Sequence, residues 1–417
     1  MDKQQKKLML TILFIAFIQM PALALTPGIN QIKTTAFSSY SLGAIQTALA
    51  VPGLIQPIAA FSAAILINRL LVTKKTVIIV GLGLLAATGF TALIAHSEFW
   101  HLVLLSFMLG VSTGLFISNV FGLIFDVFEP AQRQVVMGWQ TSVINAGGIM
   151  MSLAGGLLAT YMWYGGYIML LVGLPAAFLV AFTVPKVIRP PAPSAGGGED
   201  IEGAAAGSAG AAAASEAAAK PRRAARLNPG IYYYCAAACI FMMTYSVCGS
   251  NLSTHIAGIG NTTTAGIAVA FQMGGGVVSG LFFEKLSKKT GDFSLSFALA
   301  AVFAGFFMLS LFPASLVMVF VSVFLVGMAL SIMMPRCIFM VSTLSAGGAS
   351  TATATALVTT VAPSVGVFLS PVIFTNVTTA LFGESTSARY SFVGFVVLAF
   401  AALNAVVTAA RKRGRNE

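Results

Sequence analysis

The segment AAILINRLLVTKK at residues 63–75 returns in altered form as GLFFEKLSKKTG at residues 280–291. In both segments an apolar run reaches a polar residue, Asn68 or Glu284, and a pair of lysines follows within a few positions. The two polar residues are 216 positions apart. One local pattern that occurs twice at a long interval suggests one structural unit used twice.

A second pair of segments gives nearly the same interval. FMLG ends at Gly110 and FLVG ends at Gly327, which places them 217 positions apart. Because this match is independent of the first, the chain is expected to consist of two similar halves in parallel repeat.

The composition predicts that both halves lie in a membrane. Of 417 residues, 58% are hydrophobic and only 8% are charged, and the mean hydropathy is +0.91. A soluble domain has about a quarter of its residues charged, so a soluble enzyme is excluded. Four cysteines in this length form no disulfide framework. The expected fold class is an all-α membrane protein.

Apolar runs of the length that crosses a bilayer, roughly 20 residues each, predict twelve transmembrane helices. Six belong to an N-terminal bundle at 1–185 and six to a C-terminal bundle with a basic tail at 230–417. An Ala/Gly/Pro-rich linker at 186–229 has no apolar face to bury. The first run is also open to interpretation as a signal peptide, although it lacks a small-x-small cleavage site. The predicted helices are 8–28, 42–67, 76–95, 100–125, 136–160, 164–185, 230–252, 262–284, 294–312, 315–341, 350–376 and 389–410.

The 23 basic residues predict the orientation of these helices. Twenty fall in segments on one side, which the positive-inside rule identifies as the cytoplasm. We therefore expect a multi-pass protein of the cell (inner) membrane with both termini cytoplasmic. Lys33 and Arg389 are expected in outer loops, and Arg336 is the one basic residue expected inside the membrane. No basic stripe with interleaved aromatic residues suits nucleic acid, so the expected contact is lipid. The twenty are Lys3, Lys6, Lys7, Arg69, Lys74, Lys75, Arg133, Lys186, Arg189, Lys220, Arg222, Arg223, Arg226, Lys285, Lys288, Lys289, Arg411, Lys412, Arg413 and Arg415.

The layout and the charged loop resemble a transporter of the major facilitator superfamily over nearly the whole chain. The segment from Gly280 to Lys289 is similar to the family's loop signature, G-x-x-x-D/E-R/K-x-G-R/K-R/K. The first copy departs from it, with Ala64 for the glycine and Asn68 for the acid. The resemblance implies the twelve-helix fold of the family, alternating access, a small-molecule substrate, activity as a monomer, and no cofactor.

The charged loop is a candidate gate. A carboxylate at a helix end beside basic neighbours makes a contact that only one conformer holds, which would suit Glu284. A solvated charged turn is the alternative. The candidate gating-loop residues are Asn68, Arg69, Gly280, Glu284, Lys285, Lys288 and Lys289.

Candidate substrate-binding residues lie inside the predicted helices. The guanidinium of Arg336 suits an anionic group, although snorkelling to the cytoplasmic interface is the alternative. The repeat offset pairs Arg336 with Asn119, and Gln19, Tyr245 and Gln272 are neutral candidates well inside three other helices. Each neutral group also suits simple helix packing, as do Gln46, Gln56, Gln140, Asn145 and Asn404.

Close helix packing is also predicted for the fifth run. It contains NAGGIMMSLAGG, with Gly147, Gly148, Gly155 and Gly156. Small residues of this kind let two helices approach each other in a membrane.

The absence of Asp or Glu from the middle third of every predicted helix favours a particular kind of transport. Without a buried acid to carry a proton, an exchanger or uniporter of an organic anion is the leading hypothesis. A proton-coupled drug or metabolite efflux antiporter and a non-transporting membrane sensor are the alternatives. A membrane enzyme would need a cluster of His, Asp or Glu at depth, so neither enzymatic activity nor a metal site is expected.

Overall fold

The computed structural model describes residues 3–69, 71–185, 228–345 and 354–416. The described residues form helices and contain no strand. Eleven helices are long and apolar enough to cross a membrane, and a twelfth span results when a bent pair near the N-terminus is counted as one. The prediction of twelve spans is therefore confirmed, with the first span broken. The predicted linker at 186–229 lies almost entirely outside the described residues, and the domain boundaries remain a prediction.

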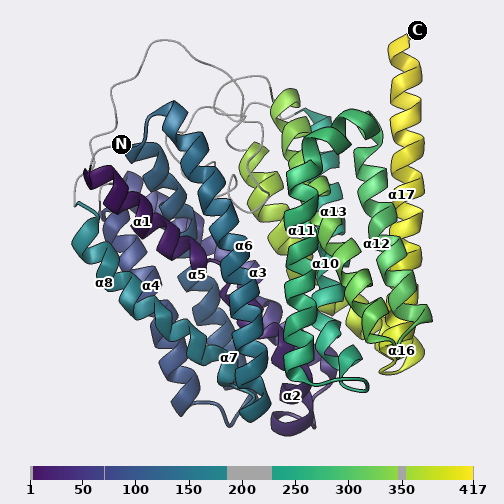
Figure 1. Cartoon of the computed structure of the whole chain (residues 1–417), viewed down its shortest axis with the longest axis horizontal. Coiled ribbons are helices and arrows are strands. Elements are labelled where there is room, and N and C mark those ends of the chain that lie inside the picture. Colours follow the sequence, from purple (N-terminus) through teal and green to yellow (C-terminus); the bar gives the residue numbers. More distant parts are fainter. Residues whose placement is uncertain (1–2, 70, 186–227, 346–353, 417) are drawn as a thin grey trace.

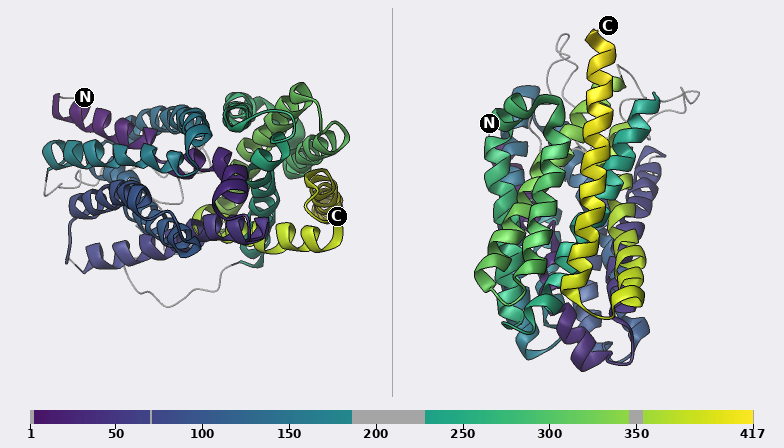
Figure 2. Two further views of the ribbon diagram at one scale, coloured as in Figure 1. Left: turned by 90° about the horizontal axis from the view of Figure 1, so that it is seen from below. Right: turned by 90° about the vertical axis from the view of Figure 1, so that its right-hand side faces the viewer.

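The helices form two groups that lie side by side (Figure 1), and a view along the bundle separates them (Figure 2). One hydrophobic core draws on residues 8–184 and the other on residues 231–401. The first group comprises α1 (Lys3–Phe17), η1 (Pro21–Ala24), η2 (Thr26–Gly28), α2 (Ile29–Gln31), η3 (Ile32–Ala36), α3 (Leu42–Asn68), α4 (Lys74–Ile94), α5 (Phe99–Val127), α6 (Pro130–Tyr161), α7 (Gly165–Ile168), η4 (Met169–Val172) and α8 (Gly173–Thr183). The second comprises α10 (Pro229–Ile256), α11 (Thr262–Thr290), η5 (Gly291–Phe293), α12 (Ser294–Leu311), α13 (Leu316–Leu344), η6 (Leu357–Val361), α15 (Ala362–Ser370), η7 (Pro371–Thr375), α16 (Asn376–Phe382) and α17 (Thr386–Asn416).

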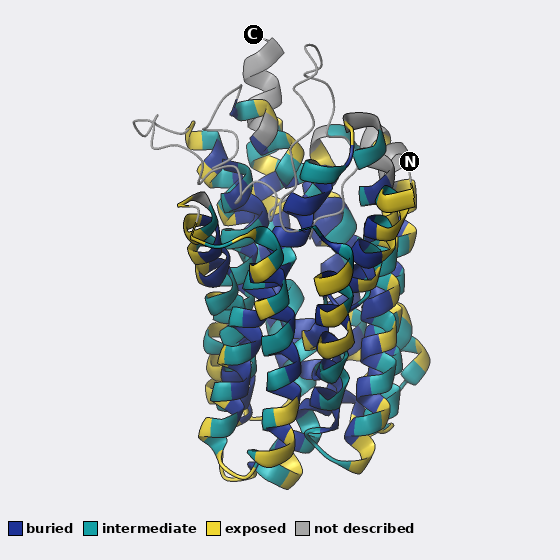
Figure 3. Ribbon diagram, turned by 90° about the vertical axis from the view of Figure 1, so that its left-hand side faces the viewer, coloured by how far each residue is buried: buried dark blue, intermediate teal, exposed yellow. Residues whose placement is uncertain are grey.

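The outward faces of the helices are apolar and exposed. Phe182 and Ile94 are each 85% exposed, and exposed residues run along the outside of the bundle (Figure 3). Exposure of such an apolar surface to water would be unfavourable, whereas lipid tails solvate it. This surface and the twelve spans identify a multi-pass membrane protein.

Proline explains the break in the first span. α1 ends at Phe17, Pro21 starts a short 3-10 helix, and the segment Pro21–Ala36 is bent by 41° relative to α1. Since proline has no N–H to donate, the α-helical hydrogen-bond pattern stops there. Gln19 lies in the break itself, where it is 93% buried.

The two glycines of the repeat have the same role in the two halves. Gly110 brings α5 onto α3, where a Cβ would press against Pro52 and Ile55. Gly327 brings α13 onto α11, where a Cβ would overlap the carbonyl oxygen of Gln272. The repeat in the sequence therefore reflects one helix contact that occurs once in each half.

The predicted close packing of the glycine-rich run is confirmed. A Cβ at Gly147 would overlap the carbonyl oxygen of Phe17, and one at Gly155 would overlap that of Ala24. Both glycines lie on α6, which thereby packs closely along the broken first span. Because the backbones of the two helices are in contact at Gly147 and Gly155, neither position has room for a larger side chain.

Replacement of Gly147 by alanine is expected to destabilise the protein by about 1–3 kcal/mol, the usual effect of overpacking. The matched control is Gly83→Ala on α4, where a Cβ meets nothing within 4 Å. Both substitutions gain the same helix propensity, so their difference isolates the contact with the first span. Thermal unfolding in detergent, followed by size-exclusion chromatography, measures it. Equal melting temperatures would contradict the packing argument.

Candidate functional site

Hydrogen bonds join the two halves at one end of the bundle, here named the outer end because the charge pattern predicts that it lies outside. This end contains the segments 37–41, 257–261 and 383–385 (Figure 1). Gln46 on α3 donates through Nε2 to the backbone oxygen of Ser250 at 2.8 Å and to Oδ1 of Asn251 at 3.0 Å. Thr375 of the second half donates to Oε1 of Gln46 at 2.6 Å. These contacts close the space between the halves at the outer end.

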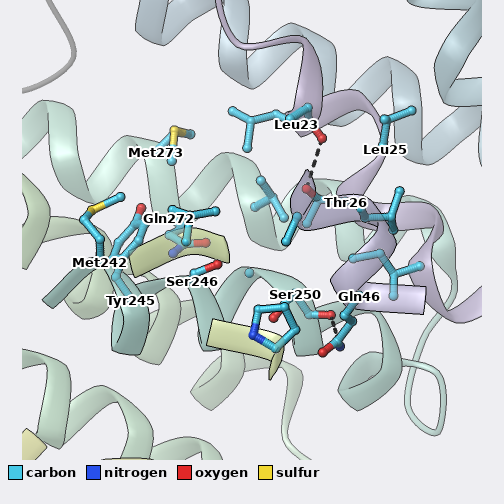
Figure 4. A pocket seen from close by; sticks show the side chains of 18 of the residues that line it. Leu23, Leu25, Thr26, Gln46, Met242, Tyr245, Ser246, Ser250, Gln272 and Met273 are labelled. Atoms are coloured by element: carbon cyan, nitrogen blue, oxygen red, sulfur yellow. Dashed lines mark hydrogen bonds between the residues drawn. The ribbon is translucent and has the colours of Figure 1, made fainter. Parts of the chain in front are cut away.

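A cavity of about 210 Å³ lies directly behind this closure. Its wall is built from both halves and is mostly apolar, and none of its described lining residues is charged. Two groups of polar side chains face each other across it: Tyr245 and Gln272 on one wall, Gln46 and Ser250 on the other (Figure 4). Such a cavity with few polar groups is typical of a small-molecule site.

Tyr245 and Gln272 supply the polar groups of the first wall. Tyr245 lies on α10 with its hydroxyl fully buried, and the polar side chain beside it is Gln272. Gln272 lies on α11, 97% buried, and its backbone is held by the contact with Gly327. A buried hydroxyl and amide that face a cavity keep hydrogen-bonding capacity that a bound solute would satisfy.

A second cavity, of about 240 Å³, lies toward the other end of the bundle, the inner end. Its lining comes from positions further along the same helices, such as Gln56 on α3 and Ser118 on α5. Met242 lines both cavities. The two spaces therefore follow each other between the halves, with the side chain of Met242 at their junction.

The five predicted substrate-binding residues are only partly brought together. Tyr245 and Gln272 share the first cavity, whereas Gln19, Asn119 and Arg336 line neither cavity. Asn119 donates to the carbonyl of its own helix, at Leu115, over 2.7 Å.

Arg336 and Gln19 lie near the inner cavity. Arg336 is half-buried on α13, two residues beyond the lining residue Met334, with its guanidinium carbon 5.6 Å from the ring centre of Phe339. Gln19 precedes the lining residue Met20, and its Nε2 has no partner among the described residues. Contact of these two residues with a solute remains a prediction.

The candidate gating loop is described only in part. The side chains of Asn68, Glu284, Lys285 and Lys288 lie outside the described residues, and Arg69, Gly280 and Lys289 are exposed. The latch predicted for Glu284 therefore remains a prediction.

Sequence reasoning missed an ion pair at the inner end. The Nζ atom of Lys74 lies 2.6 Å from Oδ2 of Asp126 and joins α4 to α5. The sequence shows both charges at helix ends, but nothing local indicates that they meet.

The sequence prediction that Arg389 lies in an outer loop is wrong. Arg389 is in the first turn of α17, and its side chain is 0% exposed. Its Nη1 donates to Oδ1 of Asn251 at 2.6 Å, and its Nε and Nη2 donate to the hydroxyl oxygens of Thr378 and Thr379, each at 2.9 Å. Arg336 is accordingly not the only embedded basic residue. These acceptors come from α10 and α16, and the sequence does not show that they meet.

Comparisons with known proteins agree with this architecture. The model of the Major Facilitator Superfamily matches residues 8–371. Among solved structures, the chain is similar to a bacterial homolog of the human lysosomal transporter Spinster. Its inward-facing, unoccupied form has a TM-score of 0.66 at 16% identity, with 98% of this chain and 96% of that chain covered. The inward-facing, occupied form has a TM-score of 0.69 at 16% identity, with 98% of each chain covered. A search of curated protein sequences finds no match.

Proposed function

The chain belongs to the major facilitator superfamily, and from this premise we propose that it exchanges or equilibrates a small organic anion across the membrane by alternating access. The observation that carries the proposal is the cavity between the two halves, closed at the outer end by the Gln46 contacts. A site enclosed by two bundles becomes accessible from the other side when the bundles rock against each other.

The charges around the cavities support an anionic solute. Arg389 is buried close to the first cavity and Arg336 is half-buried near the second, whereas no Asp or Glu lines either cavity among the described residues. Embedded positive charge in a medium of low dielectric attracts an anion. Tyr245 and Gln272 would donate hydrogen bonds to it, and Asn119, Gln19 and Arg336 would contact it nearer the inner end.

The distribution of charged residues around the two cavities also supports exchange or uniport. A buried carboxylate is the usual proton carrier in a membrane, and none lines the described cavities. Proton-coupled drug efflux would need another titrating group.

We further propose that the protein functions as a monomer in the cell (inner) membrane with both termini cytoplasmic, from the charge pattern. Reporter fusions placed within residues 186–226 and after Arg413 are expected to read as cytoplasmic. A fusion in the segment 257–261 serves as the control and is expected to read as external. A linker fusion on the outer side would contradict the orientation.

Counterflow in proteoliposomes tests the function. Purified protein is loaded with unlabelled organic anions, amino acids or cationic drugs, and uptake of the labelled compound is followed with and without a pH gradient. We expect accumulation of an organic anion that does not depend on the gradient. Strict dependence on the proton gradient would favour the efflux antiporter, and inactivity toward every class would favour a sensor.

A further inference from the structure

Arg389 is a fully buried cation with no ion pair among the described residues. Its three acceptors are the neutral oxygens of Asn251, Thr378 and Thr379. The acid nearest along the chain, Glu384, makes no ion pair with it: the exposed carboxylate lies 3.9 Å from Nζ of Lys33 and acts on the guanidinium only at longer range. A guanidinium has five N–H donors, so two of them have no acceptor in the described residues. Both the charge and the unused donors suit a small anion.

The guanidinium lies one side chain behind the wall of the first cavity. Oδ1 of Asn251 accepts from Nη1 of Arg389 and also from Nε2 of Gln46. Gln46 lines the cavity and belongs to the opposite half. Separation of the halves at the outer end would therefore withdraw Gln46 and expose the Asn251–Arg389 pair to the opening.

We propose that Arg389 is an anion-binding group of the outer gate. When the gate opens and Gln46 withdraws, the carboxylate of a solute that enters from outside reaches the guanidinium through the space that opens, and its two oxygens accept from the N–H groups of Arg389 that have no acceptor among the described residues. This inference rests on the proposed function and names the residue that receives the anion in the outward-open state.

The charge of Arg389 and the hydrogen bonds of Gln46 have opposite effects on the stability of the closed gate. Burial of a cation without a counter-ion in contact is unfavourable, and neutral acceptors and a distant exposed carboxylate offset only part of that effect, so Arg389 destabilises the closed gate. Gln46 stabilises the closed gate, because its bonds to Ser250, Asn251 and Thr375 cross between the halves. Removal of the guanidinium leaves these bonds in place. Neutralisation of Arg389 should therefore favour the closed gate, whereas a residue that only latched the gate would open it when removed.

Distances across the outer end show whether neutralisation of Arg389 closes or opens the gate. Spin labels at Ser39 and Ala257, both exposed and on opposite halves, are placed in the full chain without its native cysteines. Double electron–electron resonance is recorded with sodium succinate or with the neutral analogue succinamide, at constant ionic strength. In the protein with no further substitution, succinate is expected to increase the fraction of molecules in which the two labels are far apart, and succinamide is not.

The variants have distinct expected results. Arg389→Gln should shift the population to short distances and raise the half-maximal succinate concentration at least tenfold. Arg389→Lys keeps the charge but loses the planar guanidinium that can bind a carboxylate through two N–H groups. Its response to succinate should therefore persist with weaker affinity. Gln46→Ala should shift the population to long distances and keep the succinate response.

Longer distances in Arg389→Gln, or an unchanged succinate response in it, would overturn the proposal. Counterflow on the parent protein separates this failure from failure of the proposed function. If the parent carries organic anions while Arg389→Gln responds normally, only the role of Arg389 is wrong. If the parent carries no anion, the proposed substrate class is wrong.

Discussion

Replacement of Gln272 by leucine is expected to weaken substrate binding about ten- to hundredfold, the range of one charge-assisted hydrogen bond of about 1.5–3 kcal/mol. Leucine has a similar volume, so the contact of α11 with Gly327, which involves the backbone of residue 272, stays intact. What is lost is the amide that faces the first cavity beside Tyr245. Counterflow with the substrate found in the screen gives the apparent affinity.

Two further variants separate recognition from folding. Phe271→Leu changes the neighbouring residue, which is 46% exposed and not part of the cavity wall, and should leave affinity unchanged. Tyr245→Phe removes a buried hydroxyl whose polar neighbour is Gln272, so a loss of affinity without loss of stability reports a contact with the solute. If Gln272→Leu binds the substrate with wild-type affinity, the cavity wall formed by Tyr245 and Gln272 is not part of the binding site.

Replacement of Met242 by tryptophan is expected to reduce transport to near background while binding in the first cavity persists. Met242 is the residue common to both cavities. The methionine side chain is unbranched and adopts several rotamers, so it can move aside for a solute, whereas the larger rigid indole would fill the junction. Counterflow measures transport, and a ligand-induced rise in melting temperature measures binding.

The control for this variant is Met242→Leu, which nearly conserves volume and should retain most transport. If Met242→Trp transports normally, the solute does not pass between the two cavities. If it loses binding as well, the indole fills the first cavity and the two spaces act as one.

Much of the fold was predictable because hydropathy and repeats are local signals. The spans follow from runs of apolar residues, and the paired glycines Gly110 and Gly327 mark one helix contact in each half. The break in the first span was not predicted. Its signal was present, however, since Pro21 and Pro27 both lie in that run.

The candidate site was less predictable, because a helix position alone does not show which neighbour a side chain meets. Tyr245 and Gln272 were selected by their depth within the predicted helices, and they do face one cavity. Asn119 was selected because the repeat offset pairs it with Arg336, but it donates to its own helix. Arg336 was selected as an embedded charge, and the structure places it near the inner cavity without lining it.

Composition, span length and repeat spacing are enough to predict a membrane bundle of two similar halves, because none of these signals requires knowledge of contacts. Which polar groups close the outer end and which face the cavities depends on how the helices pack. Arg389 illustrates the reason. Its guanidinium is buried because Asn251 on α10 and Thr378 and Thr379 on α16 converge on it. Residues distant in sequence become hydrogen-bond partners only when helices pack, and no local pattern records that packing.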